Sequence, residues 1–284
     1  MKKRIFPITT IVYVLILSSL ACSFGSKNLS PDIVIEQESL SPDITAESES
    51  LPPDIVVESE SLSHDIAMFR ANPAHTGVYA GAGPKQFNEL IWKFKTDDGI
   101  GSSPTVSDGV VYFGSADGYL YAVDINTGQE KWKYKTDDVI FSSPVVSDGV
   151  VYFGSYDGYL YALDINTGQE KWKFKTDDWV YSSPAVSDGV VYFGSMDGYL
   201  YALDINTGQE QWKFNTGRMV YSSPALSDGM VYFGSHDSYL YALDTNTGQE
   251  KWKFKTDDEV WSSPAVLDGV VYFGSDDGYL YALK

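Results

Sequence analysis

The stretch ALDINTGQEKW, residues 162–172, decides the fold because it recurs along the chain at a fixed interval. Near-copies begin at Ala122, Ala202 and Ala242. The tryptophan that ends the stretch returns every 40 residues, at Trp92, Trp132, Trp172, Trp212 and Trp252. A period near 40 with strand-like content is typical of a β-propeller, whose four-stranded blades cannot bury their faces alone.

One repeat contains four strand-like segments separated by short turns. The inner strand is predicted at Ser142–Val146, the apolar second strand at Val150–Ser155 and the third at Tyr159–Asp164. The fourth, Glu170–Thr176, places lysines on one face and Trp172 and Phe174 on the other, as expected of a half-exposed outer strand.

The number of blades follows from counting these segments. The inner three occur five times, beginning near Ser102, Ser142, Ser182, Ser222 and Ser262. The last copy lacks an outer strand, whereas Leu90–Thr96 is an outer strand with no inner three before it. We therefore predict an all-β, five-bladed β-propeller of four-stranded blades over residues 90–284, closed by the N-terminal strand completing the last blade. The alternative is a fragment of a longer array.

The N-terminal residues predict export and membrane attachment. Residues 1–21 form a signal peptide, with basic MKKR, an apolar run and SSLAC before the cleavage site. This end resembles a bacterial lipobox, which would leave Cys22 lipidated; the alternative is an uncleaved membrane anchor. Residues 22–66 carry an acidic, proline-containing 11-residue repeat, predicted to be a disordered tether, and residues 67–89 lead into the propeller. The expected location is an exported, membrane-anchored lipoprotein, in the outer membrane and periplasm or at the cell surface.

The composition of the chain limits the kinds of partner that it is expected to bind. The formal net charge of −19 argues against nucleic acid and against direct attraction to anionic lipid, so membrane contact is expected through the lipid anchor only. The single cysteine excludes an intramolecular disulfide.

The pattern A-x-D-x-x-T-G-x-x-x-W resembles the tryptophan-docking motif of the pyrroloquinoline-quinone-like (PQQ-like) propeller family. FRANPAHTG, residues 69–77, is similar to the segment before the first blade in that family. The resemblance implies a docking role for the five tryptophans. The family includes quinoprotein dehydrogenases and non-enzymatic propeller lipoproteins of the outer-membrane assembly type, usually with about seven or eight blades.

Catalytic, metal and cofactor sites are not expected. A dehydrogenase of this family would need a calcium ion, acid and amide ligands, a catalytic aspartate and a stacking tryptophan, whereas the acids here recur in every repeat. His64, His75 and His236 lack zinc-ligand spacing, and no G-x-S-x-G motif occurs. The loop that begins at Asp124 lacks the spacing of an EF-hand and is interpreted as a turn.

Differences among the copies gather in the turn after the second strand and in the crossover into the next blade. Because strand direction alternates, both positions are expected at one end of the ring. The candidate binding face consists of Phe141, Tyr156, Trp179, Tyr181, Met196, Tyr221, His236 and Trp261. Exposed aromatic residues on one face suggest a partner site. Drift in exposed loops, or packing of these rings into the channel mouth, are the alternatives.

The predicted function is a membrane-tethered extracytoplasmic scaffold that binds a protein through this face. A multivalent carbohydrate-binding propeller is the alternative, and a PQQ-dependent dehydrogenase is a more distant one.

The Cys22→Ala variant tests the lipoprotein prediction. Because lipid is attached to the cysteine sulfur, this change, like globomycin treatment, should block maturation. The mass of the mature protein checks it, and a mature wild-type chain without lipid would contradict the prediction.

Overall fold

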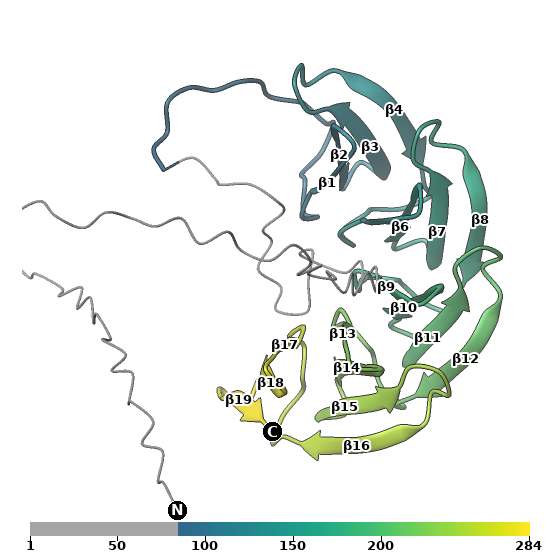
Figure 1. Ribbon diagram of the computed structural model, residues 1–284, viewed down its shortest axis with the longest axis vertical. Helices are drawn as coiled ribbons and strands as arrows, with labels where there is room; N and C mark the ends of the chain where they lie inside the picture. Colours follow the sequence, from purple (N-terminus) through teal and green to yellow (C-terminus); the bar gives the residue numbers. More distant parts are fainter. Residues whose placement is uncertain (1–84) are drawn as a thin grey trace, which may run out of the picture. The chain divides into compact units, whose positions relative to one another are not determined.

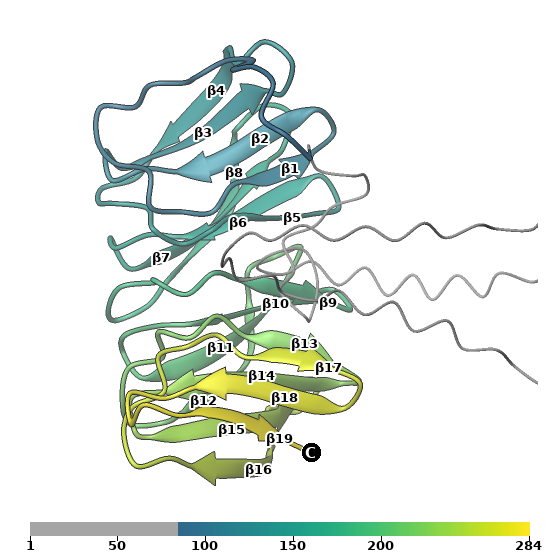
Figure 2. The same cartoon turned by 90° about the vertical axis from the view of Figure 1, so that its left-hand side faces the viewer.

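A computed structural model describes residues 85–284. The predicted signal peptide, the lipidation site at Cys22, the tether and most of the lead-in segment lie outside these residues. The remainder is all-β: successive antiparallel strands form five sheets arranged around a common axis (Figures 1 and 2). The predicted five-bladed propeller is confirmed.

Four sheets have four strands each, and the fifth has three. The first two sheets comprise β1 (Thr105–Ser107), β2 (Val110–Gly114), β3 (Tyr119–Asp124), β4 (Glu130–Lys135), β5 (Val145–Ser147), β6 (Val150–Gly154), β7 (Tyr159–Asp164) and β8 (Glu170–Lys175). The next two comprise β9 (Ala185–Ser187), β10 (Val190–Gly194), β11 (Tyr199–Asp204), β12 (Glu210–Asn215), β13 (Ala225–Ser227), β14 (Met230–Ser235), β15 (Tyr239–Asp244) and β16 (Glu250–Lys255). The last comprises β17 (Ala265–Leu267), β18 (Val270–Gly274) and β19 (Leu280–Leu283).

Each inner hairpin closes on an Asp-Gly pair. Ser147 of β5 pairs with Val150 of β6, so only Asp148 and Gly149 connect the strands. Both have positive φ, 48° and 74°, as a type I′ turn requires. The constant Ser-Asp-Gly stretches of the sequence are therefore explained by this turn.

The inner strands begin later than predicted, at Val145 rather than Ser142 in the second blade. Pro144 has no backbone N–H to give to a ladder, and the preceding serines bond to the next blade instead. The backbone N–H of Ser143 donates to Ser183 Oγ at 2.9 Å, and that of Ser183 donates to Ser223 Oγ at 2.9 Å. The same bond joins Ser103 to Ser143 and Ser223 to Ser263, so a chain of serines links all five blades.

The core lies between neighbouring blades. Phe153 of β6 is fully buried; its ring stacks on Tyr161 of the same blade at 5.2 Å and meets the edge of Tyr134 from the blade before. Strands two and three of an interior blade therefore pack against both neighbours, which explains why their sequences are mostly apolar.

The repeated tryptophans join each blade to the next at the outer rim. The Trp132 indole Nε1–H donates to the carbonyl of Ile165 at 3.1 Å, and the ring covers the turn at Gly168. Asp164 Oδ1 closes that turn by accepting the N–H groups of Asn166 and Thr167, at 3.1 and 2.9 Å. Trp92, Trp172 and Trp212 make equivalent bonds, to Ile125, Ile205 and Thr245.

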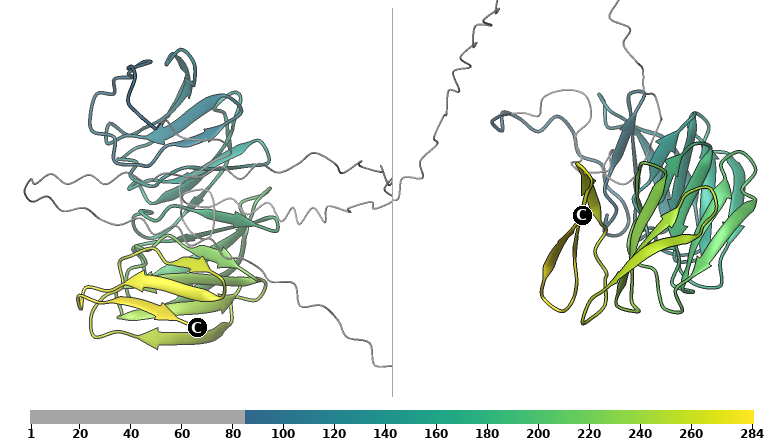
Figure 3. Two further views of the ribbon diagram at one scale, coloured as in Figure 1. Left: turned by 60° about the vertical axis from the view of Figure 1, so that its left-hand side comes forward. Right: turned by 60° about the horizontal axis from the view of Figure 1, so that its bottom comes forward.

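The predicted closure of the ring is not present. The last sheet has three strands, and Leu90–Thr96 belongs to no sheet. That segment packs on the first blade, where Trp92 Nε1 donates to Ile125 O at 2.8 Å and the Phe94 ring lies 5.2 Å from Tyr121. It therefore makes the contacts of an outer strand with the following blade but not the backbone pairing, and the arc stays open between it and β19 (Figures 1 and 3).

Across residues 85–284, no helix is long and apolar enough to cross a membrane.

Gly168 and Gly149 give a matched test of tryptophan docking. Both have positive φ, so alanine should cost about 1–2 kcal/mol of unfolding free energy at either position. A Cβ at Gly168 would also lie 2.7 Å from the Trp132 ring, whereas at Gly149 the nearest atom is 3.9 Å away. Gly168→Ala should therefore cost a further ~1–3 kcal/mol. Chemical denaturation of both variants checks this, and equal losses would show that the indole does not restrict the turn.

Candidate functional site

The structure places both variable positions of the repeat at one end of the propeller. The backbone N–H of Tyr156, in the turn between β6 and β7, donates to the carbonyl of Val139 in the crossover from β4 to β5, at 3.0 Å. Met196 and His236 are bonded in the same way to Trp179 and Met219, at 2.9 and 3.0 Å. The constant turns meet each other at the other end, where the Ile165 N–H donates to Gly149 O.

Seven of the eight predicted face residues form one continuous set of ring contacts. We call this set the aromatic cluster; it comprises Phe141, Tyr156, Trp179, Tyr181, Tyr221, His236 and Trp261. Met196, the eighth, is half-buried and is attached to the cluster through its bond to the Trp179 carbonyl.

Tyr156 is the centre of one half of the cluster. Its ring stacks on Trp179 with centroids 4.5 Å apart and an interplanar angle of 13°. Phe141 meets it edge-on at 5.4 Å, and Tyr181 lies 5.9 Å away. Rings from two successive crossovers therefore meet on a single turn residue.

Tyr221 connects this half to the other. Its ring lies 4.0 Å from that of Tyr181, and its hydroxyl is 3.3 Å from the Tyr156 hydroxyl. Burial raises the pKa of Tyr156 and of Tyr181 above the ordinary value of a tyrosine. Because Tyr156 and Tyr221 are 65 residues apart, only the ring arrangement of blades brings them together.

His236 occupies the second half, between Tyr221 and Trp261. The imidazole stacks on Tyr221 at 5.7 Å and lies 4.1 Å from the Trp261 ring. Its side chain is only 7% exposed, and its Nε2 has no hydrogen-bond partner in the described chain. Burial lowers the pKa of His236, as does Arg218, while the carboxylates of Glu259 and Asp276 act in the opposite direction.

Glu259 belongs to this half but is not among the predicted face residues. Its Oε2 accepts a hydrogen bond from Trp261 Nε1 at 2.8 Å and lies 3.6 Å from His236 Nδ1. The position of Glu259 in the repeat could have indicated its place in the cluster. Glu259 occupies the crossover position that Trp179 occupies two blades earlier, and the turn of the preceding blade carries His236.

The cluster is uneven around the axis. The first blade has Gly99, Gly101 and Ala116 at the variable positions. A Cβ at Gly101 would lie 2.5 Å from the Phe141 ring, so that ring covers the position where a side chain would stand. The rings therefore cover the end of the later blades, and the variable positions of the first blade carry no ring.

The outer surface of the cluster is apolar with an acidic border. Trp179 and Trp261 are each 43% exposed, and the remaining rings are half-buried or buried. Exposed aspartate pairs precede the crossovers, at Asp137–Asp138, Asp177–Asp178 and Asp257–Asp258. Asp138 Oδ1 accepts the N–H of Val139, so the second aspartate of a pair caps its own loop.

The acid that recurs in the turn between strands two and three has a structural role. Asp157 Oδ2 accepts the Tyr161 hydroxyl at 2.7 Å and the N–H of Asp137 at 3.1 Å. Equivalent bonds occur at Asp117, Asp197 and Asp237 with Tyr121, Tyr201 and Tyr241. In the part of the chain described here, no three His, Cys, Asp or Glu side chains form a group able to hold a metal ion.

The model of the family described as outer membrane protein assembly factor BamB matches residues 85–139, 138–220 and 196–284. The chain belongs to this family. The resemblance of its repeat to PQQ-like propellers is thereby confirmed. No curated protein matches the sequence.

Solved structures share the fold of this BamB-family chain. BamB from Moraxella catarrhalis matches with a TM-score of 0.61 and 23% identity, over 69% of this chain and 64% of that one. The computationally designed Ika8 protein matches with 0.58 and 26%, over 63% and 56%. Quinohemoprotein alcohol dehydrogenase ADHIIG from Pseudomonas putida HK5 matches with 0.56 and 22%, over 68% and 41%. The match thus spans less than two thirds of each of these proteins.

The burial of His236 predicts a pH-dependent stability. A histidine whose pKa is lower in the folded than in the unfolded chain binds fewer protons when folded, so its contribution is complete above the unfolded pKa of about 6.5 and is lost as pH falls below it. The unfolding free energy should decrease from about pH 7.5 to 5.5.

A His236→Phe variant, which keeps a ring between Tyr221 and Trp261, should show a smaller decrease over the same window. Denaturation at several pH values checks this. The wild-type protein and the variant both contain His64 and His75. An unchanged pH dependence of the unfolding free energy in the variant would therefore contradict its assignment to His236.

Proposed function

We propose that the protein is a membrane-tethered extracytoplasmic scaffold that binds a partner protein through the aromatic cluster. Membership of the family described as outer membrane protein assembly factor BamB supports a role in the cell envelope. The predicted signal peptide and the lipidation of Cys22 supply the tether. The propeller holds the cluster on a rigid platform, because the surrounding loops are bonded to the blades at every repeat.

The observation that carries the proposal is the continuity of the cluster. Its seven rings come from two turns and four crossovers, yet they contact one another without a break, and two tryptophans remain 43% exposed. Tryptophan and tyrosine supply much of the binding energy in protein interfaces because they bury large areas at a low cost in side-chain entropy.

The half-buried rings have a second role in this proposal. Tyr156 and Tyr221 are packed beneath Trp179 and Trp261, so they fix the orientation of the exposed indoles. An interface that is ordered before binding loses less entropy on association. The surrounding aspartates favour a partner whose contacting surface carries basic residues at its edge.

Carbohydrate binding is the second candidate. Trp179 and Trp261 offer exposed indole faces, on which sugar rings can stack, and the aspartates beside them can accept hydroxyl hydrogen bonds. Repeated stations would make such binding multivalent.

The proposal assigns no reaction to the protein. Propellers that share this fold include an alcohol dehydrogenase and a europium-containing methanol dehydrogenase. The recurring acids of the described residues accept hydrogen bonds from tyrosine hydroxyls and backbone N–H groups, which supports a structural role for them.

Alanine at Trp179 and Trp261 should separate binding from folding. Each change removes an exposed indole at the centre of the proposed interface, so each should weaken partner binding more than about tenfold. Tyr181→Ala should add to the loss. Cross-linking in the native host, followed by identification and titration of the captured protein, measures the effect.

Gln169→Ala and Gln209→Ala are the matched controls, since both side chains are exposed in constant turns at the opposite end. Circular dichroism verifies the fold of every variant. Undiminished capture by the tryptophan variants would contradict the proposal, and glycan-array binding that depends on the same tryptophans would favour the carbohydrate alternative.

A further inference from the structure

The last blade ends in an unpaired strand. β19 pairs with β18 on one side, and among residues 85–284 no strand pairs with its other side. In every other blade the third strand carries an outer strand at that edge. Leu280 is 80% exposed as a result, whereas its counterparts Leu120, Leu160, Leu200 and Leu240 are completely buried.

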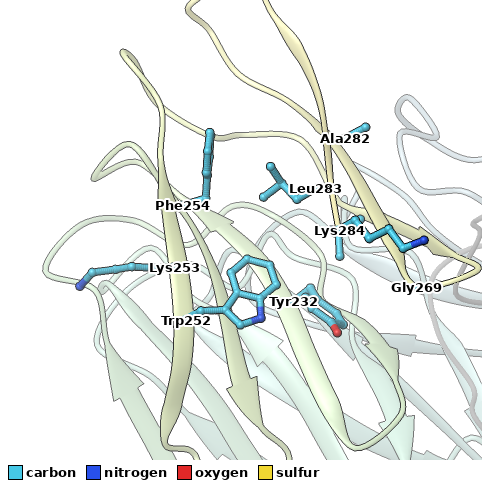
Figure 4. Close-up of a pocket in the computed structure, with 9 residues that line it drawn as sticks. Tyr232, Trp252, Lys253, Phe254, Gly269, Ala282, Leu283 and Lys284 are labelled. Carbon is cyan, nitrogen blue, oxygen red and sulfur yellow. The ribbon is translucent and has the colours of Figure 1, made fainter.

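A pocket of about 490 Å³ lies between the fourth and fifth blades, beside this edge. Figure 4 shows Trp252 and Tyr232 on one side of it and Leu283 and Ala282 on the other. Trp252 is 37% exposed. The other docking tryptophans each cover a glycine of the next blade, and no described glycine lies against Trp252 in this way.

The main chain at this edge also lacks a recurring bond. In the complete blades, the N–H of the threonine after the outer strand donates to a carbonyl in the turn before the third strand, as Thr136 does to Gly118 at 2.9 Å. Among the described residues, the carbonyl of Gly278 accepts no equivalent bond. The edge thus lacks both the backbone and the side chains of one outer strand.

The same molecule carries a segment with the sequence of that outer strand. Leu90–Thr96 is LIWKFKT, and β16 with the residue after it is EKWKFKT. Trp92 and Phe94 already pack on the first blade as an outer strand packs on the blade that follows it. The backbone of the segment has no strand partner, and Leu90 and Ile91 are 67% and 77% exposed.

Within one molecule, the geometry of the arc keeps the free edge of β19 apart from the segment Leu90–Thr96. All four contacts between successive blades use the same serine bond, with lengths of 2.8 to 3.0 Å, and three of them use the same tryptophan bond. The rotation from one blade to the next is therefore similar at each contact, and four such steps leave β19 and Leu90–Thr96 on opposite sides of an opening (Figure 1).

We propose that Leu90–Thr96 of a second copy of this chain adds to β19 as the fourth strand of the last blade. This pairing satisfies the edge without altering any contact between blades, and it places the first blade of the second copy where a sixth blade would stand. An edge strand with unpaired N–H and C=O groups is a template for such addition.

The side chains of the segment suit the edge. In the first blade, Lys135 Nζ donates to the carbonyl of Asp117 at 2.6 Å and lies 4.6 Å from the centroid of the Tyr119 ring. By the repeat, Lys95 would meet the carbonyl of Asp277 and the ring of Tyr279, which is 66% exposed. Phe94 would cover Leu280, as Phe214 covers Leu200 in the third blade.

The two surfaces differ, so the contact is head-to-tail. Each molecule offers one strand and one edge, and association produces a closed ring of chains or an open string, according to the rotation between copies.

Two variants, each with one added cysteine, test the pairing directly. Tyr119 lies opposite Lys135 in the first blade, so Lys95 and Tyr279 should lie opposite each other in the shared one. Full-length Lys95→Cys and Tyr279→Cys proteins, mixed and oxidised, should form a disulfide-linked dimer joining one of each. Wild-type protein treated alike controls for Cys22.

A third protein carries both Lys95→Cys and Tyr279→Cys. A cross-link that forms only within single chains of this double variant would overturn the proposal, because the segment would then close its own ring. The absence of any cross-link would overturn it equally.

The molecular mass of the full-length protein in detergent gives an independent measurement. Sedimentation should show species heavier than a single chain. Leu280→Asp should raise the dissociation constant at least about tenfold, because it places a charge beneath the added strand.

Leu267→Ser is the matched control. Leu267 is 56% exposed on β17, and the other blades have serine at its position, so this change should leave the association intact. A wild-type protein that remains a monomer at all concentrations would overturn the proposal.

Discussion

A four-stranded blade has two apolar faces and cannot bury them by itself, so the structure depends on how each blade is attached to the next. The attachment here is an indole ring lying on a glycine turn. Trp132 donates to the carbonyl of Ile165 and covers Gly168, whose missing side chain leaves room for the ring. At the axis, the serine chain from Ser103 to Ser263 repeats the attachment at the inner ends of the blades.

This attachment is directional, and its direction explains the two ends of the arc. An outer strand pairs with its own blade and docks on the following one, so the first blade receives Trp92 from a segment that has no sheet. The last blade has neither an outer strand nor a turn for Trp252 to cover. The exposed Leu280 and the pocket beside it follow from this arrangement.

The same regularity leaves one end of the propeller free to vary. Residues in the constant turns are committed to hydrogen bonds or to positive φ, as Asp164 and Gly149 show. In the crossovers and opposite turns, the variable residues are held through their backbone groups, as between Tyr156 and Val139, so their side chains can differ. The aromatic cluster occupies these unconstrained positions.

The sequence by itself determined the blades, the turns and the end of the ring that carries the variable residues. It could do so because the copies of the repeat can be aligned with one another, which identifies equivalent positions. Strand direction also alternates with each short turn, which shows at which end of the propeller each turn lies. Only the tertiary structure decided that Tyr156 meets Tyr221, that Glu259 joins His236 to Trp261, and that the last blade stays one strand short. Those outcomes depend on the angle of rotation between successive blades, which is set by the geometry of the recurring serine and tryptophan contacts and cannot be read from their spacing along the chain.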